Sequence, residues 1–188
     1  MNPSRELKDY SRPDSSRTQL SHAALVEPEW YAVYTRSHQE RMVKTQLDRS
    51  EVENFLPTFE KTSQWKDRKK LIQVPLFPGY LFVKISLLRR LEVLKAHGAV
   101  QLVGNSTGPV PIPEEQIASV RRFIRAGLKC DPHPYLKVGK KARIKEGPLA
   151  GFEGILVRKK NKSLFVLSVD LIQRSVSVEL GSWLIEPV

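Results

Sequence analysis

The stretch P-L-F-P-G-Y-L-F-V, Pro75 to Val83, decides how this sequence is expected to fold. In a strand, side chains alternate between the two faces, so Leu81 and Val83 point one way while Tyr80 and Phe82 point the other. Both faces of the strand are therefore apolar. Either helices cover each face, or one face is left open for another macromolecule. If one face is open, it can bind a partner; if helices cover both faces, the strand belongs only to the core.

The segments around this stretch alternate between strand and helix patterns. Strands are predicted at residues 30–35, 54–59, 71–74, 75–83 and 100–103. Helices are predicted at residues 37–47, with Ser37 as N-cap, at 86–96, and from Pro113, where Ile117, Val120 and Ile124 share a face. Residues 61–70 are too polar for a core and predict a loop or hairpin tip. This order predicts an α+β sandwich, a mainly antiparallel sheet flanked by helices.

The pattern changes after residue 126. Residues 127–136, G-L-K-C-D-P-H-P-Y-L, contain two prolines and no helical period, so we expect a linker there. Residues 137–188 contain about five short segments that alternate apolar and polar residues, which is typical of a small β-barrel. The expected organisation is a flexible leader at 1–29, an α/β domain at 30–126, the linker, and a barrel at 137–188.

Composition disfavours several classes of protein. No apolar run approaches the roughly 20 residues of a membrane span, and the N-terminus lacks a signal-peptide pattern, so we expect a cytoplasmic protein. A single cysteine, Cys130, excludes an intramolecular disulfide and a thiolate zinc cage. The four histidines are scattered, and only His133 lies near Cys130 in sequence. We therefore expect no metal, no cofactor and no enzymatic activity.

The charge distribution favours a polyanionic partner. The formal net charge is +11, and the leader is nearly balanced, with four Lys/Arg against five Asp/Glu. Residues 30–136 carry 17 basic against 10 acidic residues, and residues 137–188 carry ten against five. Basic domains of this kind favour nucleic acid over membranes. The alternative is a soluble basic surface without a nucleic-acid partner.

Two regions resemble domains of one family. V-G-K-K-A-R-I-K-E-G-P-L-A-G-F-E-G-I-L, Val138 to Leu156, resembles the KOW motif of small barrels that contact RNA, ribosomal proteins or transcription factors. W-Y-A-V-Y-T-R-S-H-Q-E from Trp30, E-N-F-L-P-T-F from Glu53 and the stretch from Pro75 resemble the NGN domain of NusG-type transcription elongation factors. The basic W-K-D-R-K-K insert and the intact L-F-P-G-Y make the chain look closer to the specialised antitermination paralogues of the RfaH, LoaP and UpxY type.

The resemblance implies two contacts with bacterial RNA polymerase. An aromatic concavity would dock on the clamp helices of the largest subunit, through Tyr34, Phe77, Pro78, Tyr80 and Phe82. The alternative for Phe77 and Phe82 is a place in the core, whereas the hydroxyl groups of Tyr34 and Tyr80 suit a wet rim. A second polymerase contact across the cleft would involve Ser86, Arg89 and Arg90. Such bridging holds the clamp closed and makes pausing and termination rarer.

The basic residues of the first domain are candidates for binding nucleic acid near the transcription bubble. The partner implied by the resemblance is non-template DNA or nascent RNA, and the alternative is a solvated basic surface. The candidates are Arg36, Arg41, Lys44, Lys66, Arg68, Lys69 and Lys70.

For the KOW domain, the resemblance implies a ribosomal protein, Rho or a Nus factor as partner, bound through Leu171, Ile172 and Arg174. Housekeeping members carry Phe-Gly before an Arg-x-x-x-Val-Glu-Leu ending, whereas this sequence has Leu171, Ile172, Gln173 and Arg174 before V-S-V-E-L. Loss of that glycine is expected to change the turn. The strand alternation predicts a stable barrel and hence an open aromatic groove. The alternative function is that of a KOW protein that binds RNA or the ribosome and acts in translation.

Overall fold

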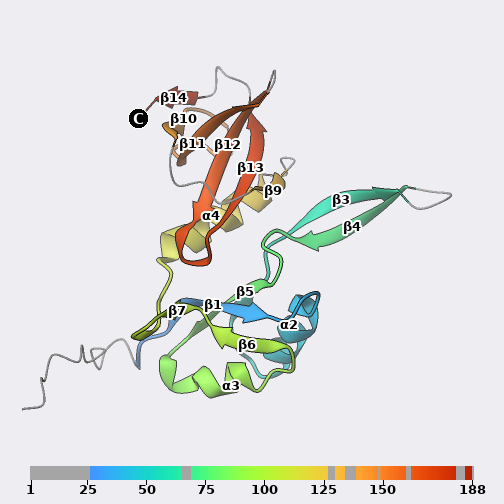
Figure 1. Ribbon diagram of the computed structural model, residues 1–188, viewed down its shortest axis with the longest axis vertical. Coiled ribbons are helices and arrows are strands. Elements are labelled where there is room, and N and C mark those ends of the chain that lie inside the picture. Colours follow the sequence, from blue (N-terminus) through green and yellow to red (C-terminus); the bar gives the residue numbers. More distant parts are fainter. Residues whose placement is uncertain are drawn as a thin grey trace, which may run out of the picture.

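A computed structural model of the chain contains an N-terminal α/β domain and a C-terminal β-rich domain, with helix α4 lying between the two (Figure 1). The structure describes residues 26–64, 69–126, 130–133, 139–147, 149–159, 162–180 and 185–187. Residues 1–25 of the predicted leader, and the predicted linker apart from 130–133, lie outside these ranges. No helix in the described part of the chain is long and apolar enough to span a bilayer.

The N-terminal domain is built on a four-stranded sheet with the order β2-β5-β1-β6, in which every neighbouring pair is antiparallel. This confirms the predicted antiparallel sheet, with the Tyr80 strand near its centre. The elements of the domain are β1 (Glu29–Thr35), α2 (Glu40–Arg49), β2 (Asn54–Phe55), β3 (Thr58–Gln64), β4 (Lys69–Pro75), β5 (Tyr80–Ile85), the 3-10 helix η1 (Leu87–Arg89), α3 (Arg90–Leu94), β6 (Ala99–Leu102), β7 (Gly104–Asn105), β8 (Gly108–Pro109) and α4 (Glu114–Arg125).

Helices cover both faces of β5. On one face, Leu81 and Val83 share a buried cluster with residues of α2 and α3, among them Val43 and Val93. On the other face, Phe82 belongs to the cluster that includes the buried side of α4: Ile117, Val120 and Phe123. An ion pair between Lys84 Nζ and Glu114 Oε2, 2.9 Å apart, also joins β5 to the start of α4. The expectation of an open face at Phe82 is therefore wrong, because Phe82 is buried in the same cluster as the apolar side of α4.

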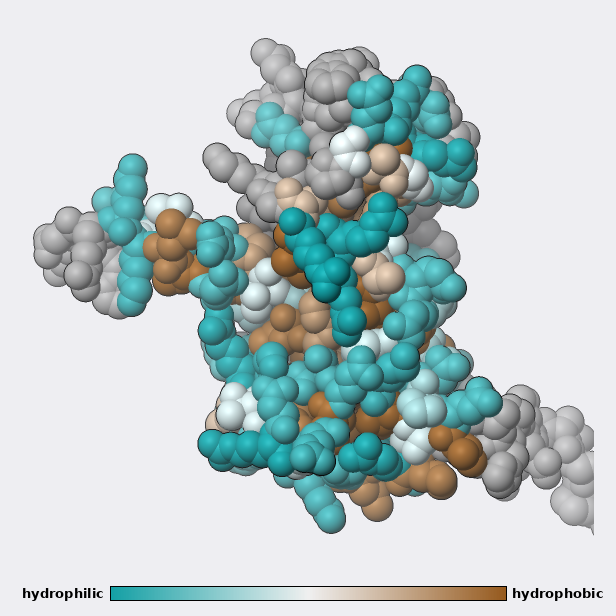
Figure 2. All heavy atoms as spheres, turned by 180° about the vertical axis from the view of Figure 1, so that it is seen from behind, coloured by the Kyte–Doolittle hydropathy of each residue, from teal (hydrophilic) through white to brown (hydrophobic). Residues whose placement is uncertain are grey.

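Strands β3 and β4 form a separate two-stranded ribbon, paired from Thr58↔Pro75 to Gln64↔Lys69. The ribbon projects from the domain as an arm (Figures 1 and 2). The predicted polar loop or hairpin at 61–70 is thus mostly strand, because its polar side chains face solvent on a ribbon rather than a core.

Two predicted helices begin or divide differently in the structure. The first begins at Glu40 rather than after Ser37, and Gln39 is its N-cap. His38 has a φ of 60°, a left-handed conformation that the start of a right-handed helix cannot include. The helix predicted at 86–96 is a 3-10 turn, η1, followed by the short α3.

The C-terminal domain is a six-stranded antiparallel sheet with the order β14-β10-β11-β12-β13-β9. All five predicted strands are present, and β9 adds a strand from the expected linker, because it pairs with the edge of β13. Among the described residues the sheet ends at β14 and β9, so closure into a barrel stays a prediction. The elements are β9 (Cys130–His133), β10 (Lys140–Ile144), β11 (Glu153–Lys159), β12 (Lys162–Val169), the 3-10 helix η2 (Asp170–Ile172), β13 (Arg174–Leu180) and β14 (Ile185–Pro187).

A close backbone approach explains one glycine of the KOW-like motif. A Cβ at Gly154 would lie 2.5 Å from Phe165 Cζ and 2.7 Å from the Val166 carbonyl oxygen. Since real Cβ atoms do not come that close, only glycine fits at this position of β11.

The two domains contact each other through α4. Arg122 Nη2 donates a hydrogen bond to the Ala150 carbonyl oxygen at 3.2 Å, and its guanidinium carbon lies 4.3 Å from the centre of the Phe152 ring. Buried side chains of both domains belong to one apolar cluster, which includes Phe123 of α4 and Phe152. The C-terminal domain therefore packs against the helix that covers the Phe82 face.

Candidate functional site

Two tyrosines form the exposed part of the predicted aromatic surface. Tyr34 and Tyr80 are direct partners in the β1–β5 register, and their ring centres lie 5.4 Å apart with an interplanar angle of 50°. Tyr34 is 42% exposed, and Tyr80 is half-buried. Pro78, in the turn before β5, is also exposed. We call Tyr34 and Tyr80 the tyrosine pair; with Pro78, they are the predicted docking residues that reach the surface.

The other two predicted docking residues are core side chains. Phe77 and Phe82 are buried, and their rings meet edge-on, with centres 6.0 Å apart and an interplanar angle of 87°. Phe82 also stacks on Phe55 at 6.2 Å. Because these rings are buried in one cluster with residues of α4 and of the C-terminal domain, a partner docked on the surface does not touch them in this conformation. They support the strand that carries Tyr80.

A buried carboxylate holds the turn beside the tyrosine pair. Glu40 is only 4% exposed, and its Oε1 accepts a hydrogen bond of 2.7 Å from the Gly79 backbone N–H. The Thr35 N–H donates to the Gly79 carbonyl oxygen at 2.8 Å. Gly79 has a φ of +83°, which favours glycine. Sequence reasoning missed Glu40, because an acid in the first turn of a helix ordinarily reflects the helix dipole.

Replacing Glu40 with alanine should lower the free energy of unfolding by about 1–3 kcal/mol, because the half-buried Gly79 N–H loses its acceptor. Glu40→Gln keeps an acceptor oxygen and should cost less. Urea denaturation of the three proteins measures both effects. A Glu40→Ala protein as stable as the wild type would contradict this role.

The C-terminal domain partly covers the tyrosine pair. The guanidinium carbon of Arg174 lies 5.9 Å from the centre of the Tyr80 ring. Leu171 packs against the same apolar cluster that contains Phe82, while Ile172 is buried. The predicted open groove is therefore wrong in this conformation. The C-terminal domain forms a sheet, but the Arg174 side chain of that domain lies over the Tyr80 ring.

The turn that precedes β13 is built without a glycine. Gln173 has a φ of +48°, the left-handed conformation that glycine adopts most readily. Gln173 therefore takes up the conformation for which glycine is best suited.

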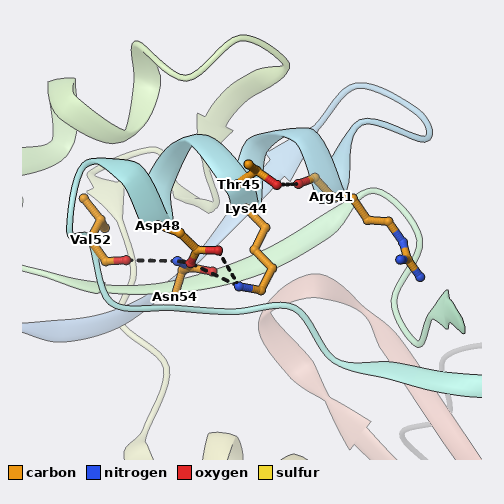
Figure 3. Close-up of polar contacts among 6 residues, drawn as sticks. All are labelled: Arg41, Lys44, Thr45, Asp48, Val52 and Asn54. Carbon is orange, nitrogen blue, oxygen red and sulfur yellow. Dashed lines mark hydrogen bonds and ion pairs between the residues drawn. The ribbon is translucent and has the colours of Figure 1, made fainter.

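The basic candidates of α2 are largely engaged within the domain. Lys44 Nζ forms an ion pair of 2.7 Å with Asp48, which also accepts a hydrogen bond from Asn54 at 2.7 Å (Figure 3). These two hydrogen bonds lower the pKa of Asp48 below its usual value. Arg41 points away from this cluster, and its guanidinium donates to the Gln73 carbonyl oxygen of the β3–β4 ribbon.

Other basic candidates remain on the surface. Arg36 is exposed, and no described residue contacts its side chain through a hydrogen bond or ion pair. Lys69 and Lys70 are exposed at the start of β4. Lys66 and Arg68 lie outside the described residues.

The predicted second contact lies at the other end of β5. Ser86 is the half-buried N-cap of η1. Arg89 is engaged with both carboxylate oxygens of Glu92, at 2.8 and 2.9 Å. Arg90 is exposed, with no recorded polar partner among the described side chains. The site as a whole offers apolar area and cations, and the described residues hold no group of three His, Cys, Asp or Glu side chains suited to a metal.

Comparisons with known proteins identify the family of the chain. The family model described as transcription termination factor NusG matches residues 28–121. The transcription termination/antitermination protein NusG of Deinococcus radiodurans is 31% identical over 183 residues, covering 81% of this chain and 95% of that protein. NusG of Lactococcus lactis is 27% identical, covering 85% and 92% of the two chains.

A solved structure supports the fold. The structure reported as a domain interaction in Thermotoga maritima NusG aligns with a TM-score of 0.54 at 20% identity, covering 86% of this chain and 98% of that chain. With the family model and the curated relatives, the conclusion is that this chain belongs to the NusG family and acts in transcription.

Proposed function

We propose that this chain docks on the clamp helices of the largest subunit of bacterial RNA polymerase and suppresses pausing and termination, at particular operons. The observation that carries the proposal is the tyrosine pair, two aromatic side chains that reach solvent side by side on adjacent strands. Rigid aromatic rings supply contact area at little cost in conformational entropy, and they are frequent anchors for a docked helix.

Docking on the clamp helices requires Arg174 to move from the Tyr80 ring. That movement frees the end of the C-terminal domain that carries Leu171 and Arg174. A ribosomal protein, Rho or a Nus factor is the proposed partner of this end, which also includes Ile172. Since Ile172 is buried, its role there is to support the half-buried Leu171 and the exposed Arg174.

A second polymerase contact near Ser86, Arg89 and Arg90 would let the domain bridge the cleft. A factor shifts the clamp equilibrium only by its difference in affinity for the closed and open states. Binding at both ends of β5 favours the closed state, because an open clamp separates the two contacts. Pauses and termination events that need opening then become rarer.

Nucleic acid near the bubble is the proposed third contact, either non-template DNA or nascent RNA. Arg36 is the leading candidate, because it is exposed next to the tyrosine pair and has no side-chain partner in the described part of the chain. Lys69 and Lys70 extend the basic surface along β4, and the basic ribbon is what suggests a specialised, operon-specific factor.

Arg36→Ala should weaken binding of the factor to a paused elongation complex and reduce the slope of log K against log salt by about 0.7–0.9, the value for one phosphate contact. Lys44→Ala serves as the matched control, because Lys44 is paired with Asp48. Fluorescence anisotropy over a salt series measures the slope. An unaltered slope for Arg36→Ala would remove this residue from the nucleic-acid contact.

Transcription in vitro with purified polymerase tests the proposed function. Saturating full-length protein should shorten the lifetime of a pause that requires clamp opening and increase read-through of a terminator. Unchanged pausing and termination would contradict the proposal and favour a KOW protein that acts in translation. We propose a cytoplasmic factor that performs no catalysis and needs no cofactor, so turnover of nucleotide or RNA by the pure protein would also contradict it.

A further inference from the structure

Three exposed leucines follow one another along the outer side of η1 and α3. Leu88, Leu91 and Leu94 are 70%, 62% and 36% exposed. They are spaced three residues apart, so each lies near the next on the same side of the segment. We call these residues the apolar stripe. Hydrophobic atoms gather at this lower end of the molecule, where α3 lies (Figures 1 and 2).

The leucines of the stripe are not needed by the core. Leu87 and Val93 of the same segment, with Ala96 after it, are buried and already pack in the apolar cluster on this face of the sheet. Exposed leucines beside a completed core indicate a surface that another segment covers.

The chain enters the N-terminal domain beside the stripe. Glu29, the first residue of β1, pairs with Ile85, the last residue of β5. In an antiparallel pair, the chain before the first of these residues and the chain after the second leave the sheet at the same end. Val26, which is 47% exposed, lies three residues before Glu29, and Leu88 lies three residues after Ile85. Since three residues span at most about 10 Å, the residues that precede Val26 begin within reach of the stripe.

The residues that precede Val26 have a composition suited to an apolar contact. L-S-H-A-A-L-V, Leu20 to Val26, contains no Asp, Glu, Lys or Arg, and all four Lys/Arg of the leader lie before Leu20. Seven residues span up to about 23 Å when extended. The stripe covers six residue steps of helix, about 9–12 Å. Residues 20–26 are therefore long enough to cover it.

The charges around the stripe favour this uncharged segment over a second copy of the chain. Arg89 forms an ion pair with Glu92, and Lys95 also interacts with Glu92, whose pKa these cations lower. Arg90 is exposed. A second copy would bring the same cations and its own net charge of +11 to the stripe, whereas residues 20–26 bring no charge.

We propose that residues 20–26 pack on the apolar stripe of the same chain. Leu20, Leu25 and Val26 supply the apolar contact, and the short connection through Glu29 keeps these residues at a high effective concentration near the stripe. Arg89 and Arg90 of the proposed second polymerase contact belong to the same segment as the stripe, so the packed residues 20–26 restrict access to it. This consequence rests on the proposed function, whereas the packing itself does not.

Photocrosslinking in the full chain tests the packing without polymerase. Benzoylphenylalanine at position 91 should crosslink to residues 20–26 of the same chain, as identified by mass spectrometry of the digested monomer. The matched control is position 71, because Leu71 is 62% exposed, as Leu91 is, but lies on the β3–β4 ribbon. Crosslinks from position 91 only to another copy of the chain, or none to residues 20–26, would overturn the inference.

Binding of the dye bis-ANS gives a second measurement that leaves the stripe unchanged. Leu20→Ser/Leu25→Ser in the full chain should raise the dye fluorescence at least twofold, because the stripe leucines become uncovered. The control is Leu7→Ser, which removes a leader leucine outside residues 20–26. Unchanged or lower fluorescence of the double variant would contradict the packing, since the loss of two leucines that cover nothing exposes no new apolar surface.

The consequence for polymerase is measured with the same double variant. Leu20→Ser/Leu25→Ser should lower the Kd for core RNA polymerase at least twofold, because a site that is partly occupied binds its partner with reduced apparent affinity. An unchanged Kd would overturn the proposed control of the second contact. If the wild type does not bind polymerase, the proposed function itself fails, while the crosslinks still decide whether residues 20–26 pack on the stripe.

Discussion

Replacing Tyr34 and Tyr80 together with alanine is expected to weaken binding to RNA polymerase at least 100-fold and to leave the fold intact. Interface hot spots cost about 2 kcal/mol or more when truncated, and the pair presents two aromatic rings 5.4 Å apart. The effect on stability should be small at Tyr34, which is 42% exposed. Biolayer interferometry with core polymerase measures the binding, and far-ultraviolet circular dichroism the fold.

The matched control for the tyrosine pair is Tyr34→Phe/Tyr80→Phe, which keeps both rings and removes only the hydroxyl groups. This control should retain most of the affinity, because ring area provides the contact. Unchanged binding of the double alanine variant would contradict docking at the tyrosine pair. Loss of its circular dichroism signal would mean that the rings stabilise the fold rather than form a docking surface.

Phe82→Ala is expected to lower the free energy of unfolding by about 3–5 kcal/mol, the usual cost of removing a buried phenylalanine ring. Phe82 is fully buried, its ring contacts those of Phe55 and Phe77, and it belongs to an apolar cluster that includes residues of α4 and of the C-terminal domain. Since natural domains are stable by about 5–15 kcal/mol, the loss would be a large part of the total. Urea denaturation followed by fluorescence measures it.

The control for Phe82→Ala is Phe82→Leu, which keeps an apolar side chain and should cost less than the alanine variant. A Phe82→Ala protein that keeps wild-type stability but loses polymerase binding would contradict the core assignment. Such a result would return Phe82 to the docking surface.

The sequence was sufficient to predict most elements of the fold, but it was not sufficient to predict what covers them. Tyr80 to Val83 forms the expected strand, because aromatic and apolar residues alternate there. The same pattern fits an open or a covered face, so the burial of Phe82 under α4 was not predictable from it. Strand β9 was missed because Pro132 argues against a strand, although an edge strand tolerates proline.

Only part of the candidate site was predicted, because local sequence patterns do not show which distant residues come into contact. Tyr34 and Tyr80 were predicted as surface residues from the resemblance and because a phenol hydroxyl tolerates a wet rim. Their pairing on adjacent strands became visible only in the β1–β5 register. The Arg174 contact with Tyr80 and the Glu40 hydrogen bond to Gly79 join residues far apart in sequence. No local sequence pattern shows that Arg174 and Glu40 make these contacts, whereas other charged residues stay in solvent. The ion pair of Lys44 with Asp48 was readable from its spacing of four residues, which is typical of paired charges on a helix.

Competition by a clamp-helix fragment tests the central claim most directly. The full chain would be immobilised, bound to purified core RNA polymerase, and challenged with an excess of the isolated clamp-helix coiled coil of the largest subunit. If the tyrosine pair docks on the clamp helices, the fragment displaces the polymerase, and the Tyr34→Ala/Tyr80→Ala variant binds neither. Polymerase binding that the fragment does not displace, or no binding at low and moderate salt, would contradict the account.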